Sequence, residues 1–74
     1  MALSITIRPA EDGWSVRSAD LGQDFVFASG GRAEAFGREL AARCAREGHA
    51  VELEIILRDE TVAAVIPFGR AAAA

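Results

Sequence analysis

One amphipathic segment, from Gly31 to Gly48, limits most strongly what this chain can fold into. At about 100° per residue, its apolar side chains gather on one arc, and arginine and glutamate side chains cover the remainder. The arc consists of Ala33, Phe36, Gly37, Leu40 and Cys44. A helix with one apolar stripe must bury it, and the flanking segments offer only β-strands as packing partners. The pattern therefore predicts one helix lying on one sheet.

The segments on both sides of this helix alternate apolar and polar residues, as half-buried strands do. Pro9 is expected to end the first strand, because proline lacks the N–H that a ladder needs. The five predicted strands are Leu3–Arg8, Trp14–Ser18, Asp24–Ala28, Val51–Arg58 and Thr61–Phe68. The order β-β-β-α-β-β predicts an α+β fold, with one mostly antiparallel sheet and a single helix packed on one face. Residues 1–69 form one predicted domain, and 70–74 a disordered tail.

The ends and the middle of the helix carry further signals. Ser29 and Gly31 are alternative N-caps, and Gly48 is the expected left-handed terminator. Gly37 lies inside the helix on the buried arc, where glycine costs about 1 kcal/mol relative to alanine. We expect its missing side chain to allow close approach to a bulky sheet residue such as Trp14. The crossing from the third to the fourth strand leaves a parallel pairing of the fourth strand open.

Charge and hydropathy exclude some classes of function. The chain carries eight basic side chains, all arginine, against eleven acidic ones, for a net charge of −3. A protein that binds nucleic acid without sequence preference carries a basic excess, so this balance argues against that class. No apolar run approaches the roughly 18 residues that span a bilayer, and Met1–Ser4 does not resemble a signal peptide. We therefore expect a cytoplasmic protein with no membrane partner.

Catalytic and ligand-binding signals are sparse. The chain has one cysteine, Cys44, and one histidine, His49, which cannot supply a thiolate and imidazole metal site. Cys44 falls on the apolar arc, which indicates a small buried hydrophobe rather than a nucleophile. Glu52 and Glu54 project from the same strand face, and whether they or His49 have a role stays open. We predict no enzyme activity, no catalytic residues, no cofactor and no metal.

The composition leaves apolar side chains without a predicted cover. A domain of this length buries only about 60% of the surface of its unfolded chain, so further burial would stabilise it. One helix shields one face of a sheet, whereas several apolar residues are expected on the other face or on the last strand. These predicted interface residues are Val26, Ile56, Val65 and Ile66. A second copy of the chain is the expected cover, through face packing or pairing of the last strand, and another protein is the alternative.

Short motifs along nearly the whole chain resemble a known family. They are Trp14-x-Val16, Ala33-x-Ala35, Leu40-Ala41, Ala45-x-x-Gly48, Val51-Glu52-Leu53 and Arg58-Asp59. Together they resemble short bacterial proteins classed as domain of unknown function 2188, and the resemblance implies architecture rather than activity. The chain departs from that family at Glu60, where glycine is usual, and at Phe68, where an aromatic hydroxyl is common.

A second resemblance covers residues 5 to 47. Asp12-Gly13, Ala19-Asp20-Leu21-Gly22 and the Ser29-Gly30 helix start are similar to the HicB-type antitoxin fold. That resemblance implies binding of a small RNA-cleaving toxin. It does not extend to promoter repression, because the chain lacks the family's C-terminal DNA-binding segment. The leading hypothesis is thus a homodimeric, non-enzymatic protein-interaction module, and the alternative is an antitoxin or another nucleic-acid-associated binding protein.

Overall fold

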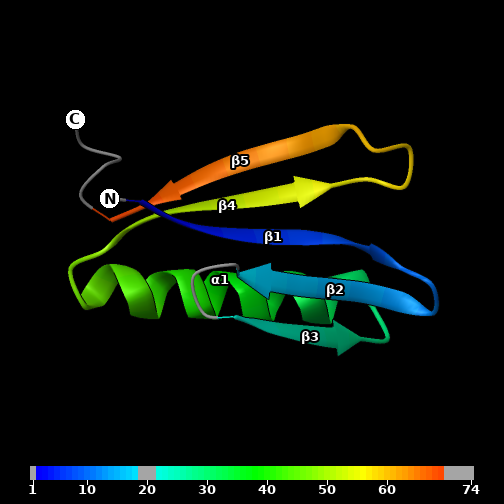
Figure 1. The fold of residues 1–74 in the computed structure, drawn as a ribbon, viewed down its shortest axis with the longest axis horizontal. Coiled ribbons are helices and arrows are strands. Elements are labelled where there is room, and N and C mark those ends of the chain that lie inside the picture. Colours follow the sequence, from blue (N-terminus) through cyan, green and yellow to red (C-terminus); the bar gives the residue numbers. More distant parts are fainter. Residues whose placement is uncertain (1, 19–21, 70–74) are drawn as a thin grey trace.

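The fold is one helix packed on one face of a five-stranded sheet (Figure 1). The computed structural model describes residues 2–18 and 22–69, so the tail predicted at 70–74 lies outside the described residues. The strands are β1 (Ala2–Ala10), β2 (Gly13–Ser18), β3 (Gln23–Phe27), β4 (Ala50–Ile56) and β5 (Val62–Phe68), and the helix α1 is Gly30–Arg46. The α+β fold and the predicted order β-β-β-α-β-β are confirmed.

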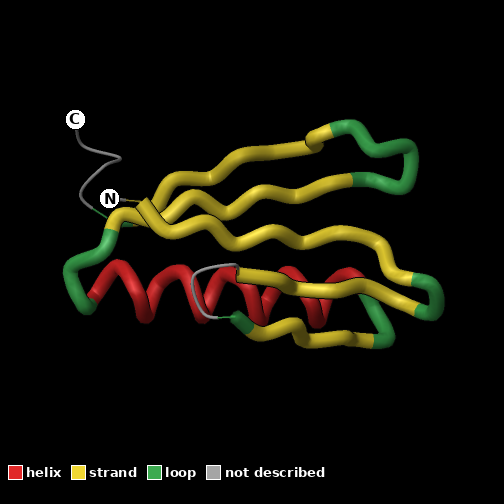
Figure 2. Tube along the Cα trace, viewed as in Figure 1, coloured by secondary structure: helices red, strands yellow, loops and turns green. Residues whose placement is uncertain are grey.

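The strands lie side by side in the order β3-β2-β1-β4-β5 (Figure 2). β4 pairs parallel with β1, whereas the other three neighbouring pairs are antiparallel. The helix accounts for this mixture, because it carries the chain from the end of β3 back to the start of β4, beside the start of β1. The edge strands of the sheet are thus β3 and β5, and each has one side without a partner strand.

Pro9 does not end the first strand, contrary to the prediction. β1 continues to Ala10, and Pro9 lies opposite Trp14 in the antiparallel pairing with β2. The pairing of β1 with β4 ends earlier, at Ile7 and Ile55. Beyond that point β1 has a neighbour on one side only, so a proline without an N–H is tolerated there as it is on an edge strand.

Both ends of α1 are fixed by local capping. The Ser29 side chain accepts a hydrogen bond from the Arg32 amide at 3.2 Å, which identifies Ser29 rather than Gly31 as the N-cap. At the other end Gly48 has φ +98°. The amides of Gly48 and His49 donate to the carbonyls of Ala45 and Cys44. This Schellman motif satisfies the last carbonyls and confirms Gly48 as the terminator.

Small residues form the centre of the helix stripe. Ala33, Gly37, Ala41 and Cys44 are buried, at the spacing of one helix face. They pack on the buried strand residues Ile5, Ile7, Val16, Val51 and Leu53. Ala41 is absent from the predicted arc, whereas Phe36 and Leu40 flank the stripe and are half-buried. The helix axis can therefore lie close to the sheet.

Gly37 is the point of closest approach, but its partner differs from the prediction. A Cβ atom at Gly37 would lie 2.8 Å from Cδ1 of Ile7 and 3.3 Å from Cδ1 of Leu53. Trp14 instead lies against Gly30, where an added Cβ would be 3.1 Å from the indole. The prediction placed Trp14 too far along the helix, because it did not include the strand order that puts β1 and β4 under the helix centre.

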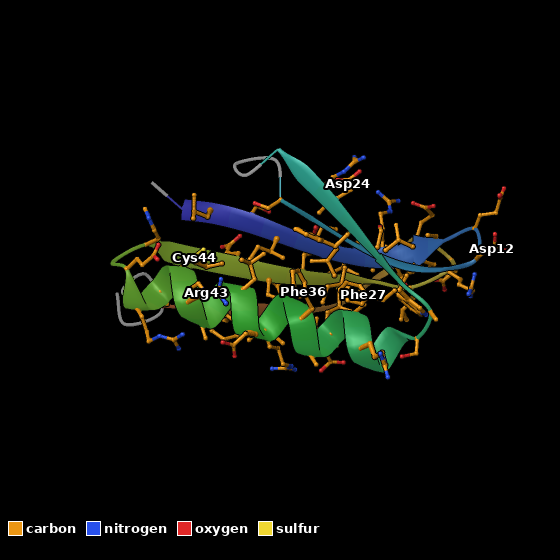
Figure 3. All side chains as sticks on the ribbon, turned by 90° about the horizontal axis from the view of Figure 1, so that it is seen from below. Asp12, Asp24, Phe27, Phe36, Arg43 and Cys44 are labelled. Carbon is orange, nitrogen blue, oxygen red and sulfur yellow. The ribbon has the colours of Figure 1, made fainter. Side chains whose placement is uncertain are left out.

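An aromatic cluster fastens α1 to β3. The ring of Phe36 lies 4.7 Å from that of Phe25 and 5.1 Å from that of Phe27, measured between centroids. Figure 3 shows Phe27 and Phe36 between the helix and the sheet, whereas Asp24 points away from the helix.

At the opposite corner, a Cβ on Gly69 would lie 3.3 Å from that of Ala45, near the helix end. The helix thus begins near β2 and β3 and ends near β5.

Candidate interaction surface

The sheet face opposite α1, here called the open face, is polar in its middle and apolar at its margins. Register defines its rows, since partners across neighbouring strands share a face. One row runs from Asp24 through Arg17, Thr6 and Glu54 to Val65. Parallel to it, Ser4 and Glu52 lead to Pro67. The apolar residues expected on this face are therefore confined to its margins, and polar side chains occupy its middle.

A cross-strand ion pair occupies the β3 side of the open face. Arg17 donates from Nε and Nη2 to the two carboxylate oxygens of Asp24, both at 2.9 Å. The hydrogen bond from Arg17 holds the pKa of the Asp24 carboxyl below its usual range, and the same hydrogen bond raises the pKa of Arg17. Both side chains are more than half exposed, at 63% and 51%, so this pair sets local geometry rather than overall stability.

Three of the four predicted interface residues lie on the open face. Val26 and Val65 are 69% and 51% exposed, and Ile56 is half-buried. Ile66 lies on the opposite face, because it pairs with Leu53 and packs against the core under the helix. Val26 on β3 is also separated from Ile56 on β4 by β2 and β1. The four residues therefore do not form one patch.

The apolar side chains that do gather belong to β5 and its neighbour. Val62 is 51% exposed and lies opposite Ile56, so it extends the apolar margin that Val65 begins. Ile66 and Phe68 emerge half-buried on the helix side of the same strand. We call Ile56, Val62, Val65, Ile66 and Phe68 the β5 surface. Its sequence signal was the run Thr61–Phe68, which contains no charged residue.

Two features shorten the edge that β5 presents. The register of β4 and β5 shifts between Ile55 and Ile56, which leaves Ala63 as the extra residue of a bulge. Pro67, near the other end, has no N–H to donate. The straight part of the β5 edge is therefore short.

Leu57, which was predicted to belong to the fourth strand, lies beyond the end of β4 and is 42% exposed.

Glu52 and Glu54 lie on the open face next to the β5 surface. Their register partners on β5 are Pro67 and Val65. Within residues 2–18 and 22–69, no group of three histidine, cysteine or acidic side chains is arranged to hold a metal ion. The two carboxylates thus form an acidic border along one side of the apolar strand.

Cys44 and His49 occupy positions with different access to solvent. Cys44 is 7% exposed within the core, whereas His49 is exposed just beyond the helix terminator. Their contact is through the backbone, since the His49 amide donates to the Cys44 carbonyl at 3.1 Å. A nucleophilic thiolate requires access and an electropositive environment. The surroundings of Cys44 are those of a packed hydrophobe.

Comparison with known proteins gives no assignment, since no family model, curated protein or solved structure matches this chain. The two family resemblances therefore stay predictions. Over the part of the chain that the structure describes, no helix has the length and apolar character needed to cross a membrane.

Proposed function

We propose that this protein is a small, non-enzymatic interaction module of the cytoplasm that forms a homodimer through the edge of β5. The observation that carries the proposal is the exposure of β5 on both faces. Every residue of β5 is half-buried or exposed, although the strand is apolar throughout. β4, its neighbour, buries Val51 and Leu53 completely. An apolar strand without cover is the part of this molecule that gains most from a partner.

The free edge of β5 supports pairing with a second copy. An edge strand presents unpaired backbone groups, and antiparallel pairing of β5 with its own copy satisfies both sets at once. Such a contact is two-fold symmetric and closes, because each copy uses the same strand. The bulge at Ala63 and the missing N–H of Pro67 restrict the pairing to a short segment, which favours a discrete dimer over a growing fibre.

Side chains must contribute area beyond the backbone pairing. A stable protein interface buries roughly 1,200 Å² or more in total. Val62 and Val65 on the open face, and Ile66 on the helix face, flank the edge and would be buried by the partner strand. Each square ångström of apolar surface removed from water contributes about 25 cal/mol. The proposed interface therefore includes both faces of β5.

The charges of the open face favour a protein partner over nucleic acid. The Arg17 guanidinium is already engaged by Asp24, and the carboxylates nearest the β5 surface are Glu52 and Glu54. A nucleic-acid surface presents unpaired basic side chains to the phosphates. The antitoxin resemblance, which implies a protein partner, is compatible with the same surface.

The test is the oligomeric state of a matched pair of variants. Light scattering at about 100 µM protein is expected to give a dimer for the native chain, and Val65→Lys is expected to weaken it at least about 100-fold, because a charge would enter the desolvated seam. In the monomer the new lysine would lie opposite Glu54, so the fold is preserved. Val26→Lys places the same change on the other edge and should leave the dimer intact. A native chain that stays monomeric at several hundred micromolar contradicts the proposal.

A further inference from the structure

A hollow opens where the parallel strands β1 and β4 stop pairing. Their ladder ends at Ile7 and Ile55, and the two chains then diverge toward their turns, at the right-hand end of Figure 1. The hollow has a volume of about 140 Å³ and is lined by Arg8, Pro9, Ala10, Leu57, Arg58 and Glu60. It lies at the carboxyl ends of β1 and β4, beyond the last residues of their parallel ladder.

Two arginines line this hollow, Arg8 from the open face and Arg58 from the side of Trp14, and their guanidinium groups have different partners. Arg8 donates from Nη2 to Oε1 of Glu60 at 3.2 Å. Arg58 lies with its Cζ atom 5.9 Å from the centre of the Trp14 ring, which is a cation–π contact. Among the described residues, no carboxylate forms an ion pair with Arg58. One guanidinium is thus paired with the Glu60 carboxylate, and the other contacts an aromatic ring and forms no ion pair with a described carboxylate.

The backbone of Glu60 has an unfavourable conformation. Its φ is +72°, the left-handed region that favours glycine, and it is the one such non-glycine residue among those described. This conformation is strained for a residue with a side chain, and an exposed ion pair offsets little of that strain. The Glu60 side chain is 78% exposed, so water competes for it. The Glu60 carboxylate therefore shows where an acidic group contacts Arg8, and its own interaction with Arg8 is weak.

We propose that this hollow binds a small dicarboxylate, one carboxylate replacing that of Glu60 on Arg8 and the other pairing with Arg58. Planar guanidinium groups match the geometry of carboxylates, and two of them suit a dianion. A cavity of about 150 Å³ holds a molecule of benzene's size, which corresponds to a four-carbon dicarboxylic acid. The site is independent of the proposed dimer, since none of its lining residues belongs to the β5 surface.

An NMR titration of the native chain with succinate tests the proposal. The expected result is saturable shifts of the backbone amides of residues 8, 10 and 57–60, with a dissociation constant in the millimolar range. Glu60→Gly removes the competing carboxylate, and glycine accepts the left-handed conformation of this position, so succinate should bind about fivefold more tightly. Arg8→Gln should weaken binding at least about tenfold, because it removes one charged partner.

Three controls separate a built site from general attraction of anions. Arg17→Gln removes an exposed, ion-paired arginine outside the hollow and should leave the affinity for succinate unchanged. Succinamide, which is neutral and of similar size, should give no shifts, and inorganic phosphate should bind more weakly than succinate. The proposal is overturned if Glu60→Gly does not strengthen binding, if Arg8→Gln and Arg17→Gln weaken it equally, or if phosphate binds as well as succinate. Amide spectra of each variant establish that it is folded.

Discussion

The two edge strands of the sheet, β3 and β5, differ in how strongly they discourage pairing with a further strand. β3 is five residues long, contains Asp24 and is fastened to the helix by the rings of Phe25 and Phe27 against Phe36. β5 is seven residues long, contains no charge, and all of its side chains are half-buried or exposed. Charge on an edge discourages a further strand, whereas an uncharged apolar edge invites one. The comparison indicates that β3 is protected against pairing with a further strand, whereas β5 is open to such pairing.

The largest effect is expected from removing the aromatic anchor of the β3 edge. Phe36→Ala deletes the ring that contacts both Phe25 and Phe27, and should lower the free energy of unfolding by about 3 kcal/mol. Val65→Ala on the β5 edge, measured at low protein concentration where the chain is monomeric, should change it by less than about 0.5 kcal/mol. Urea unfolding followed by Trp14 fluorescence measures both. Equal losses in the two variants would remove the distinction between the edges.

A smaller effect is expected where the start of β2 meets the end of β3. A Cβ on Gly13 would overlap the carbonyl oxygen of Phe27, a backbone atom that cannot move without breaking the pairing of these strands. Gly13→Ala should therefore cost about 2 kcal/mol.

The matched control is Gly31→Ala, in the first turn of the helix, where an added Cβ meets nothing within 4 Å. That change should stabilise the protein by up to about 1 kcal/mol, because alanine is the better helix former. Thermal unfolding distinguishes the two glycines by the sign of the change. A stabilising Gly13→Ala would show that β3 does not hold its position against β2.

The smallest effect concerns the exposed carboxylates that decorate each edge. The hydrogen bond from Arg17 lowers the pKa of Asp24 beside β3, and hydrogen bonds from the Thr61 hydroxyl and amide lower the pKa of Asp59 in the turn before β5. A lowered pKa favours the charged form in the folded state. The resulting stability is present above the unfolded value of about 3.9 and is lost as the pH falls through the folded pKa.

Carboxyl NMR titration should therefore place both groups below that reference value. Asp24→Asn should remove the β3 contribution to acid sensitivity while leaving the titration of Asp59 unchanged. A value for Asp24 at or above the reference would indicate that the ion pair with Arg17 is not populated in solution.

Periodicity predicted the elements well because each element buries one face. Alternation along Leu3–Arg8 and along Val51–Arg58 identified two strands, the second of which ends earlier, at Ile56, and the arc containing Ala33 and Cys44 identified the helix. Gly48 was identified as the helix terminator, because it acts on neighbours a few residues away, whereas the choice between Ser29 and Gly31 as the N-cap was made only by the structure. Pro9 was misjudged because its tolerance depends on where β4 stops, which is a non-local fact.

The candidate surface was only partly predictable, for a related reason. Apolar residues follow one another without a period from Val62 to Ile66, so the sequence does not say which of them face the helix. The pairing of Ile66 with Leu53, after the bulge at Ala63, decides which of these residues face the helix. Val26 and Ile56 share a face yet lie apart, because β2 and β1 come between their strands. The hollow beside Glu60 had no signal in the periodicity or composition of the chain.

The sequence by itself determined one helix, five strands, the helix terminator Gly48 and a net charge of −3, because these depend on spacing and composition along the chain. Tertiary structure alone decided the strand order, the face on which Ile66 lies and the meeting of Arg8 with Glu60. Those features join residues far apart in sequence, and local periodicity carries no information about which strands become neighbours.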